Sequence, residues 1–366
     1  MNVSKISLKN YRNFKEEVFS PKGGINIIYG DNAQGKTNLL EAIWLFTGGR
    51  SFRGSKDQEL VKFDELYAEL AMDFRSKKRE QCAEIRIQDK KRKVSLNGIE
   101  KTSAAALVGN FCAVVFSPCH LSLVKDGPLQ RRKFIDSSIC QIKPSYCKTL
   151  SVYNHIINQR NTLLKDIRHY PDLLDTLEIW DQRLSDYGAV LLKERNDYCK
   201  LLKEEAQKVY SGIADGKEVL SLSYKSNFKE IDDLCLRDIK EGLLQSLKKQ
   251  RQIDLNLGFT SVGPHRDDLN LEIDGKLLRA FASQGQQRSC VLALKIAEAI
   301  ILMDKIGEKP IILLDDVMSE LDRKRQKYLM DVIKDFQVFI SLCEPSSVVF
   351  DEEFEKFKVE KGKIYS

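Results

Sequence analysis

The stretch Gly30-Asp31-Asn32-Ala33-Gln34-Gly35-Lys36-Thr37 matches the phosphate-binding pattern G-x-x-x-x-G-K-[ST]. Ile25 to Tyr29 before it predicts a buried strand, and Asn38 to Phe46 after it predicts a helix. Glycines let consecutive backbone N–H groups surround phosphates, and the helix start adds the positive end of its dipole. We therefore expect a nucleotide here, with Lys36 on the β- and γ-phosphates and the Thr37 hydroxyl on Mg²⁺.

Length and composition bound the class of protein. A chain of 366 residues can hold two or three domains, and 59 Lys+Arg against 53 Asp+Glu leave a net charge of +6. That excess allows a basic surface patch without demanding nucleic acid. Nine scattered cysteines with no C-x-x-C pair indicate reduced thiols rather than disulfides or a zinc site. Because no apolar run is long enough for a membrane span or signal peptide, we expect a cytoplasmic protein.

The pattern of apolar residues changes along the chain. Val3 to Leu8, 66 to 74, 82 to 88, 92 to 96 and Phe111 to Phe116 predict strands, the middle three forming an antiparallel meander. From 121 to 250 the periodicity is helical: Trp180, Leu184, Tyr187, Leu191 and Tyr198 share one helix face. The heptad pattern does not persist, which favours a compact helical lobe over a coiled coil. Strand character is expected again from Leu255.

Three motifs follow in the last third of the chain. Ser283-Gln284-Gly285-Gln286 precedes an apolar helix, Ile311 to Asp316 predicts a buried parallel strand ending in two carboxylates, and Ser319 to Asp322 comes next. A phosphate-binding loop near residue 30 and carboxylates near residue 315 must meet around one Mg²⁺. The two ends of the chain therefore form one domain. We predict residues 1–120 and 251–366 as its halves, with 121–250 as the inserted helical lobe.

This order of motifs resembles the ABC-type ATPase heads of the SMC and Rad50 group. Six motifs carry a closer resemblance: Tyr11-Arg12-Asn13-Phe14, Gly30 to Thr37, Ser51-Phe52-Arg53, Gly263-Pro264-His265-Arg266-Asp267-Asp268, Ser283 to Arg288, and Leu314 to Asp322. Together they resemble the RecF family of bacterial recombination mediators. This resemblance implies an α/β fold: an ABC-type P-loop ATPase head, with a mixed sheet and an antiparallel β subdomain, joined to an all-helical second lobe.

The resemblance also implies a site built from two protomers that sandwich two ATP molecules. The residues expected to bind ATP are Arg12, Gly30, Asp31, Asn32, Ala33, Gln34, Gly35, Lys36 and Thr37, and, reaching across the interface, Ser283, Gly285 and Gln286. A serine hydroxyl and N–H groups at a helix start donate to phosphate without adding charge. Capping of a helix that begins near Gln286 explains Ser283 alone equally well.

Catalysis is expected from Lys36, Asp315 and Asp316, with Thr37 and Asp315 as the Mg²⁺ ligands. Asp316 stands where related ATPases carry a glutamate that acts on the attacking water. Since aspartate is one methylene shorter, we predict a weak, DNA-stimulated ATPase with turnover well below about 10 per second. The family's sensor glutamine and switch histidine are also replaced: residues 116–120 contain Ser117, and Ser341 follows the apolar run 336–340.

Basic residues in turns and loops are the candidates for DNA contacts. They are Arg53, Lys77, Lys78, Arg79, Lys90, Lys91, Arg92 and Lys93, with Arg50 and Arg131-Arg132-Lys133 as further possibilities. Turns rich in Lys and Arg offer sequence-independent contacts to phosphates. A charge run is nevertheless more often only a solvated loop. His265 is expected to belong to a structural turn with a buried ion pair.

By resemblance, the chain is expected to be an ATP-gated homodimer that clamps double-stranded DNA near single-strand gaps and releases it on hydrolysis. It would assist RecA loading in DNA repair, replication restart and SOS induction, with partners of the RecR and RecO kind. Two alternatives stay open: the nucleotide-binding subunit of an ABC transporter, and an ATPase head coupled to a nuclease. For the second, the 44 residues after Asp322 are too few for an appended nuclease domain.

Overall fold

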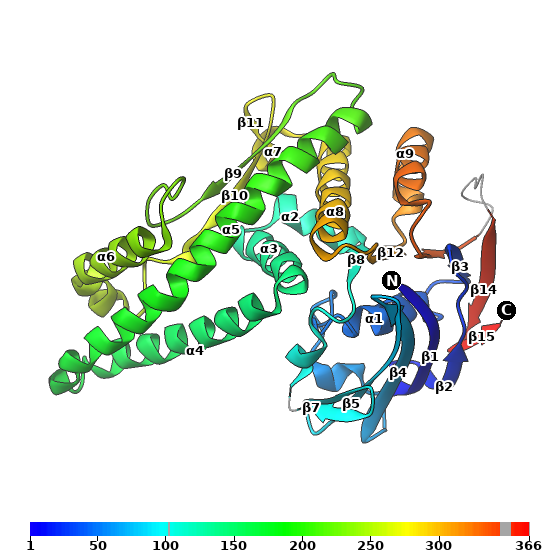
Figure 1. Cartoon of the computed structure of the whole chain (residues 1–366), viewed down its shortest axis with the longest axis horizontal. Coiled ribbons are helices and arrows are strands. Elements are labelled where there is room, and N and C mark those ends of the chain that lie inside the picture. Colours follow the sequence, from blue (N-terminus) through cyan, green and yellow to red (C-terminus); the bar gives the residue numbers. More distant parts are fainter. Residues whose placement is uncertain (102, 345–352, 366) are drawn as a thin grey trace. The chain divides into compact units, whose positions relative to one another are not determined.

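The computed structural model describes residues 1–101, 103–344 and 353–365, and its contacts divide the chain into two compact units (Figure 1). The first unit contains Met1–Leu121, Glu205–Val219 and the residues from Ser283 onward. The second contains Ser122–Glu204 and Leu220–Ala282. We expected the chain to return to the ATPase lobe at residue 251. Instead, residues 251–282 cluster with the second unit, and residues 205–219 cluster with the first.

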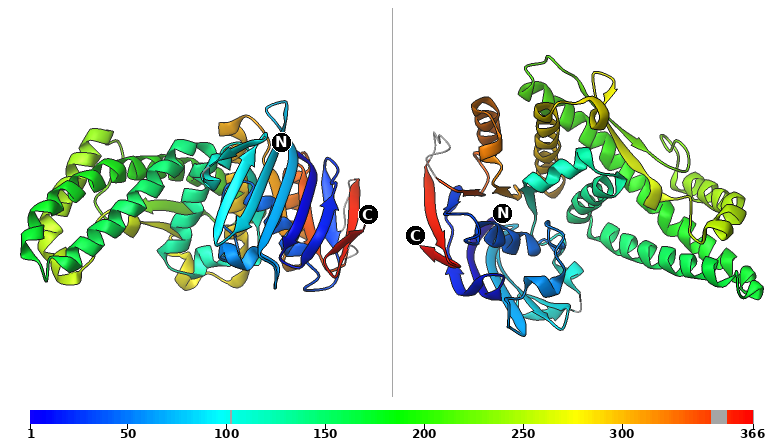
Figure 2. Two further views of the ribbon diagram at one scale, coloured as in Figure 1. Left: turned by 90° about the horizontal axis from the view of Figure 1, so that it is seen from below. Right: turned by 180° about the vertical axis from the view of Figure 1, so that it is seen from behind.

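An antiparallel sheet of six strands lies in the first unit, in the order β2-β1-β4-β5-β6-β7 (Figure 2). Its strands are β1 (Asn2–Tyr11), β2 (Phe14–Phe19), β4 (Tyr67–Ser76), β5 (Arg79–Gln88), β6 (Lys91–Leu96) and β7 (Ile99–Lys101). Lys77-Lys78 joins β4 to β5 and Asp89-Lys90 joins β5 to β6, with positive φ at all four residues. Such two-residue turns match the twist of paired strands, and the predicted meander is confirmed.

A second six-stranded sheet of this unit has the order β15-β14-β3-β13-β12-β8 and is parallel except for β15. Its strands are β3 (Ile25–Tyr29), β8 (Ala113–Phe116), β12 (Ile311–Asp315), β13 (Val338–Leu342), β14 (Phe354–Glu360) and β15 (Lys363–Tyr365). The apolar run 336–340 overlaps β13, but it does not contain the last strand, because β14 and β15 follow it. β14 was missed because only Phe357 and Val359 of its polar sequence are buried.

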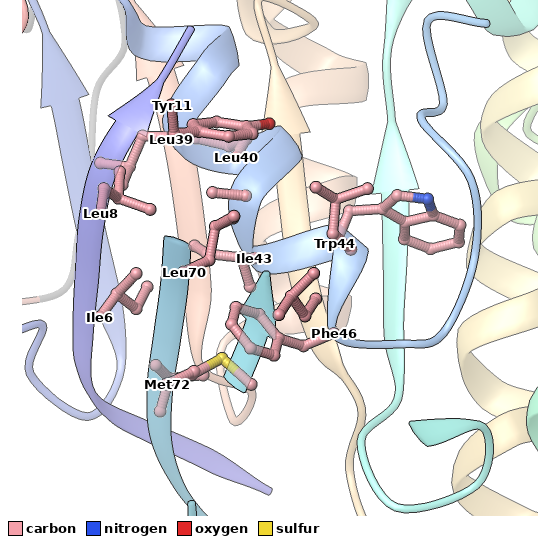
Figure 3. Close-up of a cluster of buried hydrophobic side chains, with 14 of the residues drawn as sticks. Ile6, Leu8, Tyr11, Leu39, Leu40, Ile43, Trp44, Phe46, Leu70 and Met72 are labelled. Atoms are coloured by element: carbon pink, nitrogen blue, oxygen red, sulfur yellow. The ribbon is translucent and has the colours of Figure 1, made fainter. Parts of the chain in front are cut away.

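Helix α1 (Lys36–Leu45) packs between the two sheets of the first unit, and its apolar side chains fill the space between them (Figure 3). Leu39, Leu40 and Ile43 are fully buried against Ile6 and Leu70 of the antiparallel sheet. Burying these apolar side chains away from water is the main source of stability for the packing of α1 between the sheets. The phosphate-binding loop is therefore held between a rigid strand and a rigid helix.

Two more helices of the first unit follow the predicted motifs. Helix α8 (Gln284–Ile306) begins at the S-x-G-Q motif, and α9 (Arg323–Ile333) begins after Asp322. Gly307 ends α8 in the left-handed conformation, with φ of 76°, which glycine adopts without a steric penalty. The long apolar helix predicted over 291–303 is confirmed within α8.

The second unit contains helices and a small sheet. Its helices are α2 (Ser122–Lys125), α3 (Pro128–Ile142), α4 (Pro144–Asp166), α6 (Leu236–Leu257), α7 (Leu278–Phe281) and the larger part of α5 (Leu177–Ile213). Leu184, Leu191 and Tyr198 are buried on one face of α5, as predicted. No helix in the described ranges combines the length and the apolar character that crossing a membrane requires.

The second lobe is not all-helical, which corrects the sequence-based expectation. Strands β9 (Leu220–Lys225), β10 (Asp268–Ile273) and β11 (Lys276–Leu277) form an antiparallel sheet in the order β11-β10-β9. Leu220 and Leu222 alternate with polar residues in β9, a strand period that the helical surroundings obscured. The strand character expected from Leu255 is also wrong, because that residue lies inside α6.

Candidate nucleotide-binding site

The predicted phosphate-binding residues Gly30 to Thr37 form one turn between β3 and α1. Gly30 and Gly35 have φ of 146° and 122°, values that other residues rarely adopt. A Cβ atom at Gly35 would lie 2.6 Å from the Asn13 side chain. Since Asn13 donates a hydrogen bond of 2.6 Å to the Gln34 carbonyl, this asparagine supports the loop from the β1–β2 side. Both glycines are therefore required by geometry.

Lys36 lies inside the loop, with only 4% of its surface exposed. Its ammonium group donates to the carbonyl oxygens of Gly30, at 2.6 Å, and Asp31, at 2.9 Å. It also lies 4.0 Å from the Cys343 sulfur. None of these partners is a carboxylate, so the buried ammonium keeps a positive charge that a phosphate can neutralise. The loop thus presents a fixed cation together with backbone N–H groups, which suits a phosphate.

Asp315 ends β12 and is 5% exposed. Thr37 donates to its Oδ1 at 2.7 Å, Ser341 donates to the same oxygen at 3.1 Å, and Ser117 donates to Oδ2 at 3.4 Å. Burial raises the pKa of Asp315, and the nearby Asp316 adds to that increase while the bonds from Thr37 and Ser341 oppose it. Within the described residues no ion pair reaches Asp315, so its partners are hydroxyl groups.

Ser117 and Ser341 occupy the positions where the family resemblance led us to expect a glutamine and a histidine, and no motif assigns these serines a role. Ser117 follows β8, and Ser341 lies in β13. Both strands flank β12, so their carboxyl ends meet Asp315 at one edge of the sheet. The signal that would have found them is a polar residue at the end of each buried apolar strand.

Asp316, the predicted catalytic carboxylate, has φ of 52°, which places it in the left-handed region. Aspartate tolerates that region better than most residues do. Its backbone N–H donates to the Ser341 hydroxyl at 2.9 Å. Because Ser341 also bonds to Asp315, one buried serine fixes the two carboxylate residues relative to each other. This accounts for a tight turn at the end of β12.

Arg12, one of the expected ATP-binding residues, is held in place by a buried carboxylate. Its guanidinium bonds to both oxygens of Glu41, at 2.9 and 3.1 Å, and to the Ser55 hydroxyl at 2.7 Å. Glu41 is fully buried and also accepts hydrogen bonds from Tyr11 and Ser51. The arginine side chain remains 17% exposed. Arg12 is thus fixed by α1 at the edge of the antiparallel sheet, directly before the Asn13 that supports the phosphate-binding loop.

The predicted S-x-G-Q segment forms the first turn of α8. Ser283 is the N-cap: its Oγ accepts from the Gln286 N–H at 3.2 Å, while the Gln286 Oε1 accepts from the Ser283 N–H at 2.8 Å. This reciprocal capping box satisfies two of the N–H groups that a helix start leaves unpaired. Ser283 is exposed, and the capping bond uses only a lone pair of its oxygen. The hydroxyl hydrogen is therefore not consumed by the cap.

The structure separates the basic candidates for DNA contacts into two groups. Lys77, Lys78 and Arg79 lie at one end of β5, and Lys90 and Lys91 lie at the other. Since β5 has 10 residues, the two turns are about 33 Å apart. The Lys90 turn and Arg12 lie at the same end of the antiparallel sheet, because the last residues of β1 and of β5 both pair with the first residues of β4.

Several arginines among these candidates are engaged in internal contacts. Arg92 donates to the Gly49 carbonyl at 2.8 Å and pairs with Asp57 at 2.5 Å, and only 6% of its side chain is exposed. Arg131 is buried in a bidentate pair with Asp268. Arg53 donates to the Asn38 side chain at 3.1 Å. Arg92 and Arg131 are therefore engaged in contacts that stabilise the fold. Lys90, Lys91 and Lys93 remain exposed towards the end of the antiparallel sheet where Arg12 lies, which we call the nucleotide edge.

The chain is similar over its whole length to known proteins. Residues 2–364 match the family model described as the RecF/RecN/SMC N terminal domain. Proteins named "DNA replication and repair protein RecF" from Acetivibrio thermocellus and Ruminiclostridium cellulolyticum are 40% and 42% identical, with all of each chain covered.

Solved structures give the same picture. A structure titled as the recombination mediator protein RecF with ATP in the RecFOR pathway is 39% identical and has a TM-score of 0.93, covering all of this chain and 97% of that one. An SMC head domain from Pyrococcus furiosus covers all of this chain and 96% of that one at 17% identity, with a TM-score of 0.53. The second likeness concerns the fold alone.

Proposed function

The chain belongs to the RecF family of DNA replication and repair proteins, and from this membership we propose that it is an ATP-dependent, DNA-binding recombination mediator. The observation that carries the proposal is the junction of Thr37 and Asp315, whose side chains meet at 2.7 Å although 278 residues separate them. A phosphate-binding loop and a buried carboxylate at one sheet edge are the two halves of a site for a nucleotide and its metal ion.

Mg²⁺ fits the residues at this edge. Asp315 is a buried carboxylate whose described partners are neutral hydroxyls, and a divalent cation would compensate its charge. Thr37 and Asp315 would hold the ion, which when bound neutralises charge on the phosphates. Lys36 binds the β- and γ-phosphates from inside the loop. Asp316 orients the attacking water, and its short side chain makes hydrolysis slow.

We propose that two protomers close on two ATP molecules, with Ser283 and Gly285 of one protomer facing the phosphate-binding loop of the other. Two features support this role for Ser283: it is exposed at the positive end of α8, and its cap leaves the hydroxyl hydrogen available to a phosphate. Arg12, fixed by Glu41, adds a positive charge at the nucleotide edge.

DNA binding and protein partners extend this proposal. Two solved relatives are described as recombination mediator proteins in the RecFOR pathway. We propose that this chain likewise works with RecR- and RecO-type partners to assist RecA loading at gapped DNA. The closed dimer would hold duplex DNA, and hydrolysis would release it. Exposed lysines near the nucleotide edge support a contact to the DNA backbone that depends on ATP.

Molar mass in solution tests the ATP-gated dimer. Light scattering with and without ATP·Mg²⁺ is expected to show conversion of the wild-type monomer to a dimer. Ser283→Arg should block the conversion by placing a bulky cation in the interface, whereas Ser283→Thr retains the hydroxyl and the cap and should still dimerise. A wild type that stays monomeric with ATP and gapped DNA would contradict the proposed clamp.

A further inference from the structure

The segment that links α5 to β9 contacts the first turn of α8, and nothing in the motif pattern predicts this contact. Glu218 lies in that segment, and its Oε1 accepts a hydrogen bond of 2.9 Å from the Gln286 side-chain amide. Its Oε2 accepts a hydrogen bond of 2.6 Å from the buried Tyr210 hydroxyl near the end of α5. All three residues belong to the first unit. One carboxylate thus joins the end of α5 to the start of α8.

Gln286 is the middle member of this chain of contacts. Its Oε1 accepts from the Ser283 N–H and its Nε2 donates to Glu218, so both ends of the side-chain amide are engaged inside the protomer. The family resemblance had assigned Gln286 to ATP. Within the protomer, its side chain is a bridge that connects Ser283 to Glu218.

We propose that Glu218 is a positioning residue for Ser283, acting through Gln286, and this inference rests on the proposed ATP sandwich. A carboxylate near the N-terminus of α8 is favourable to the helix dipole, and its bond to an amide is stronger than a neutral one. With Glu218 in place, Gln286 holds one rotamer and the Ser283 N–H stays bonded. Without it, the exposed first turn of α8 frays and the Ser283 hydroxyl loses its fixed direction.

The matched variants are Glu218→Ala, Glu218→Gln and Asp215→Asn. Asp215 lies in the same linker and pairs with Lys324, so its substitution changes the charge there without touching α8's first turn. Glu218→Gln keeps an oxygen for Gln286 and an amide that can donate to the Tyr210 oxygen. We expect Glu218→Ala to weaken the ATP-dependent dimer about tenfold, Glu218→Gln to restore it to within about threefold, and Asp215→Asn to leave it unchanged.

ATP affinity of the monomer, measured with a fluorescent ATP analogue at protein concentrations below dimerisation, should stay within about twofold in all three variants. A Glu218→Ala protein that dimerises like the wild type would overturn the inference. So would an equal loss of monomer affinity for ATP in that variant, because it would indicate a general structural defect.

Hydrogen exchange separates this inference from the proposed function. In nucleotide-free protein the Ser283 amide should exchange about tenfold faster in Glu218→Ala than in the wild type or Asp215→Asn. Unchanged exchange would overturn the Glu218 contact as a positioning device even if the wild type dimerises with ATP. A wild type that never dimerises would overturn the sandwich itself, which is a different failure.

Discussion

Two buried polar clusters, one in each unit, differ in how their charges are compensated. In the second unit Arg160, Asp181 and Asp254 are all fully buried, and Arg160 pairs with each aspartate at 2.8 Å. Arg251 adds a second bond to Asp181 at 2.9 Å. In the first unit the buried Asp315 receives only hydroxyl groups among the described residues.

A buried charge without an internal counter-charge marks a place where a ligand can bind. Burying a charge without a counter-charge is costly, so a protein retains such a group only where something else compensates it. The Arg160 cluster is neutralised by the chain itself and therefore stabilises one arrangement of α4, α5 and α6. Asp315 has no ion-pair partner among the described residues, and we propose that a bound cation neutralises it. Removing each charge should consequently have opposite effects on stability.

The largest expected effect is the loss of stability in Arg160→Met. This change leaves Asp254 without its cation and Asp181 with only the half-exposed Arg251, and should lower the free energy of unfolding by about 3–5 kcal/mol. Urea denaturation monitored by circular dichroism measures it. Lys248→Met, which breaks the exposed pair of Lys248 with Glu178 on α6 and α5, is the control and should change little. Equal, small effects of both substitutions would show that the buried cluster is not structural.

Asp315→Asn should lower ATP hydrolysis strongly without lowering the stability of the fold. ATP hydrolysis should fall at least about 100-fold, or about 2.7 kcal/mol in activation free energy, because the amide cannot compensate a cation. The melting temperature of the nucleotide-free protein should not fall, since the substitution removes a carboxylate whose pKa is raised by burial. A variant that is both inactive and strongly destabilised would place Asp315 with the structural cluster and end the contrast.

His265 is a buried titratable group of the second unit whose hydrogen-bond partners belong to the protein itself. Its Nε2 donates to the Thr260 carbonyl at 3.0 Å, so its Nδ1 accepts from the Tyr153 hydroxyl at 2.7 Å. Burial lowers the pKa of His265 to about 4. The predicted turn with a buried ion pair corresponds to these contacts together with Arg131 and Asp268.

A lowered histidine pKa means that the unfolded chain binds the proton more tightly than the native protein. Stability should therefore decrease as pH falls from about 6.5 towards 4, by on the order of 2 kcal/mol. The His265→Gln variant, which keeps a donor for Thr260, should show a smaller slope between pH 6.5 and 5 in urea titrations. ATP affinity should not follow this slope. An unchanged slope would mean that folding does not lower the pKa of His265.

The smallest expected effect concerns exposed charges at the two ends of the antiparallel sheet. Lys90 and Lys78 each occupy the second position of a two-residue turn, with φ of 62° and 61°. Asparagine tolerates this conformation, so Lys90→Asn and Lys78→Asn form a matched pair. Lys90→Asn should reduce the salt dependence of ATP-dependent DNA binding by about one unit of log–log slope, and Lys78→Asn should not. Identical slopes would remove the Lys90 turn from the DNA contact.

Much of the first unit follows from local patterns. The strand, loop and helix around residues 25–46 combine apolar periodicity with glycines that the backbone requires. The sequence predicts that Thr37 and Asp315 meet, because both are expected to hold one ion, and their hydrogen bond of 2.7 Å confirms the meeting. The separation of the two basic turns was also predictable, since successive hairpin turns of a meander lie at opposite ends of the sheet.

What the sequence does not reveal depends on long-range pairing. Arg160 and Asp254 are 94 residues apart, and neither lies in a recognisable motif. Glu218 reaches α8 only because the end of α5 returns to the first unit. The small sheet of the second unit was missed because two short alternating runs are weak against long helical periodicity. Motifs indicate the function, whereas residues such as Glu218 are recognisable only from their contacts in the folded chain.

The most direct test of a carboxylate awaiting a cation is to locate the ion. A crystal of the protein with Mn²⁺ and a non-hydrolysable ATP analogue, measured at an energy where manganese scatters anomalously, gives the ion's position independently of any assumed role. We expect one strong peak beside the Thr37 hydroxyl, from an ion bonded to Asp315 directly or through one water, and we expect this peak to disappear in Asp315→Asn. Ordered nucleotide without a peak at this edge, or a peak that persists in the variant, would contradict it.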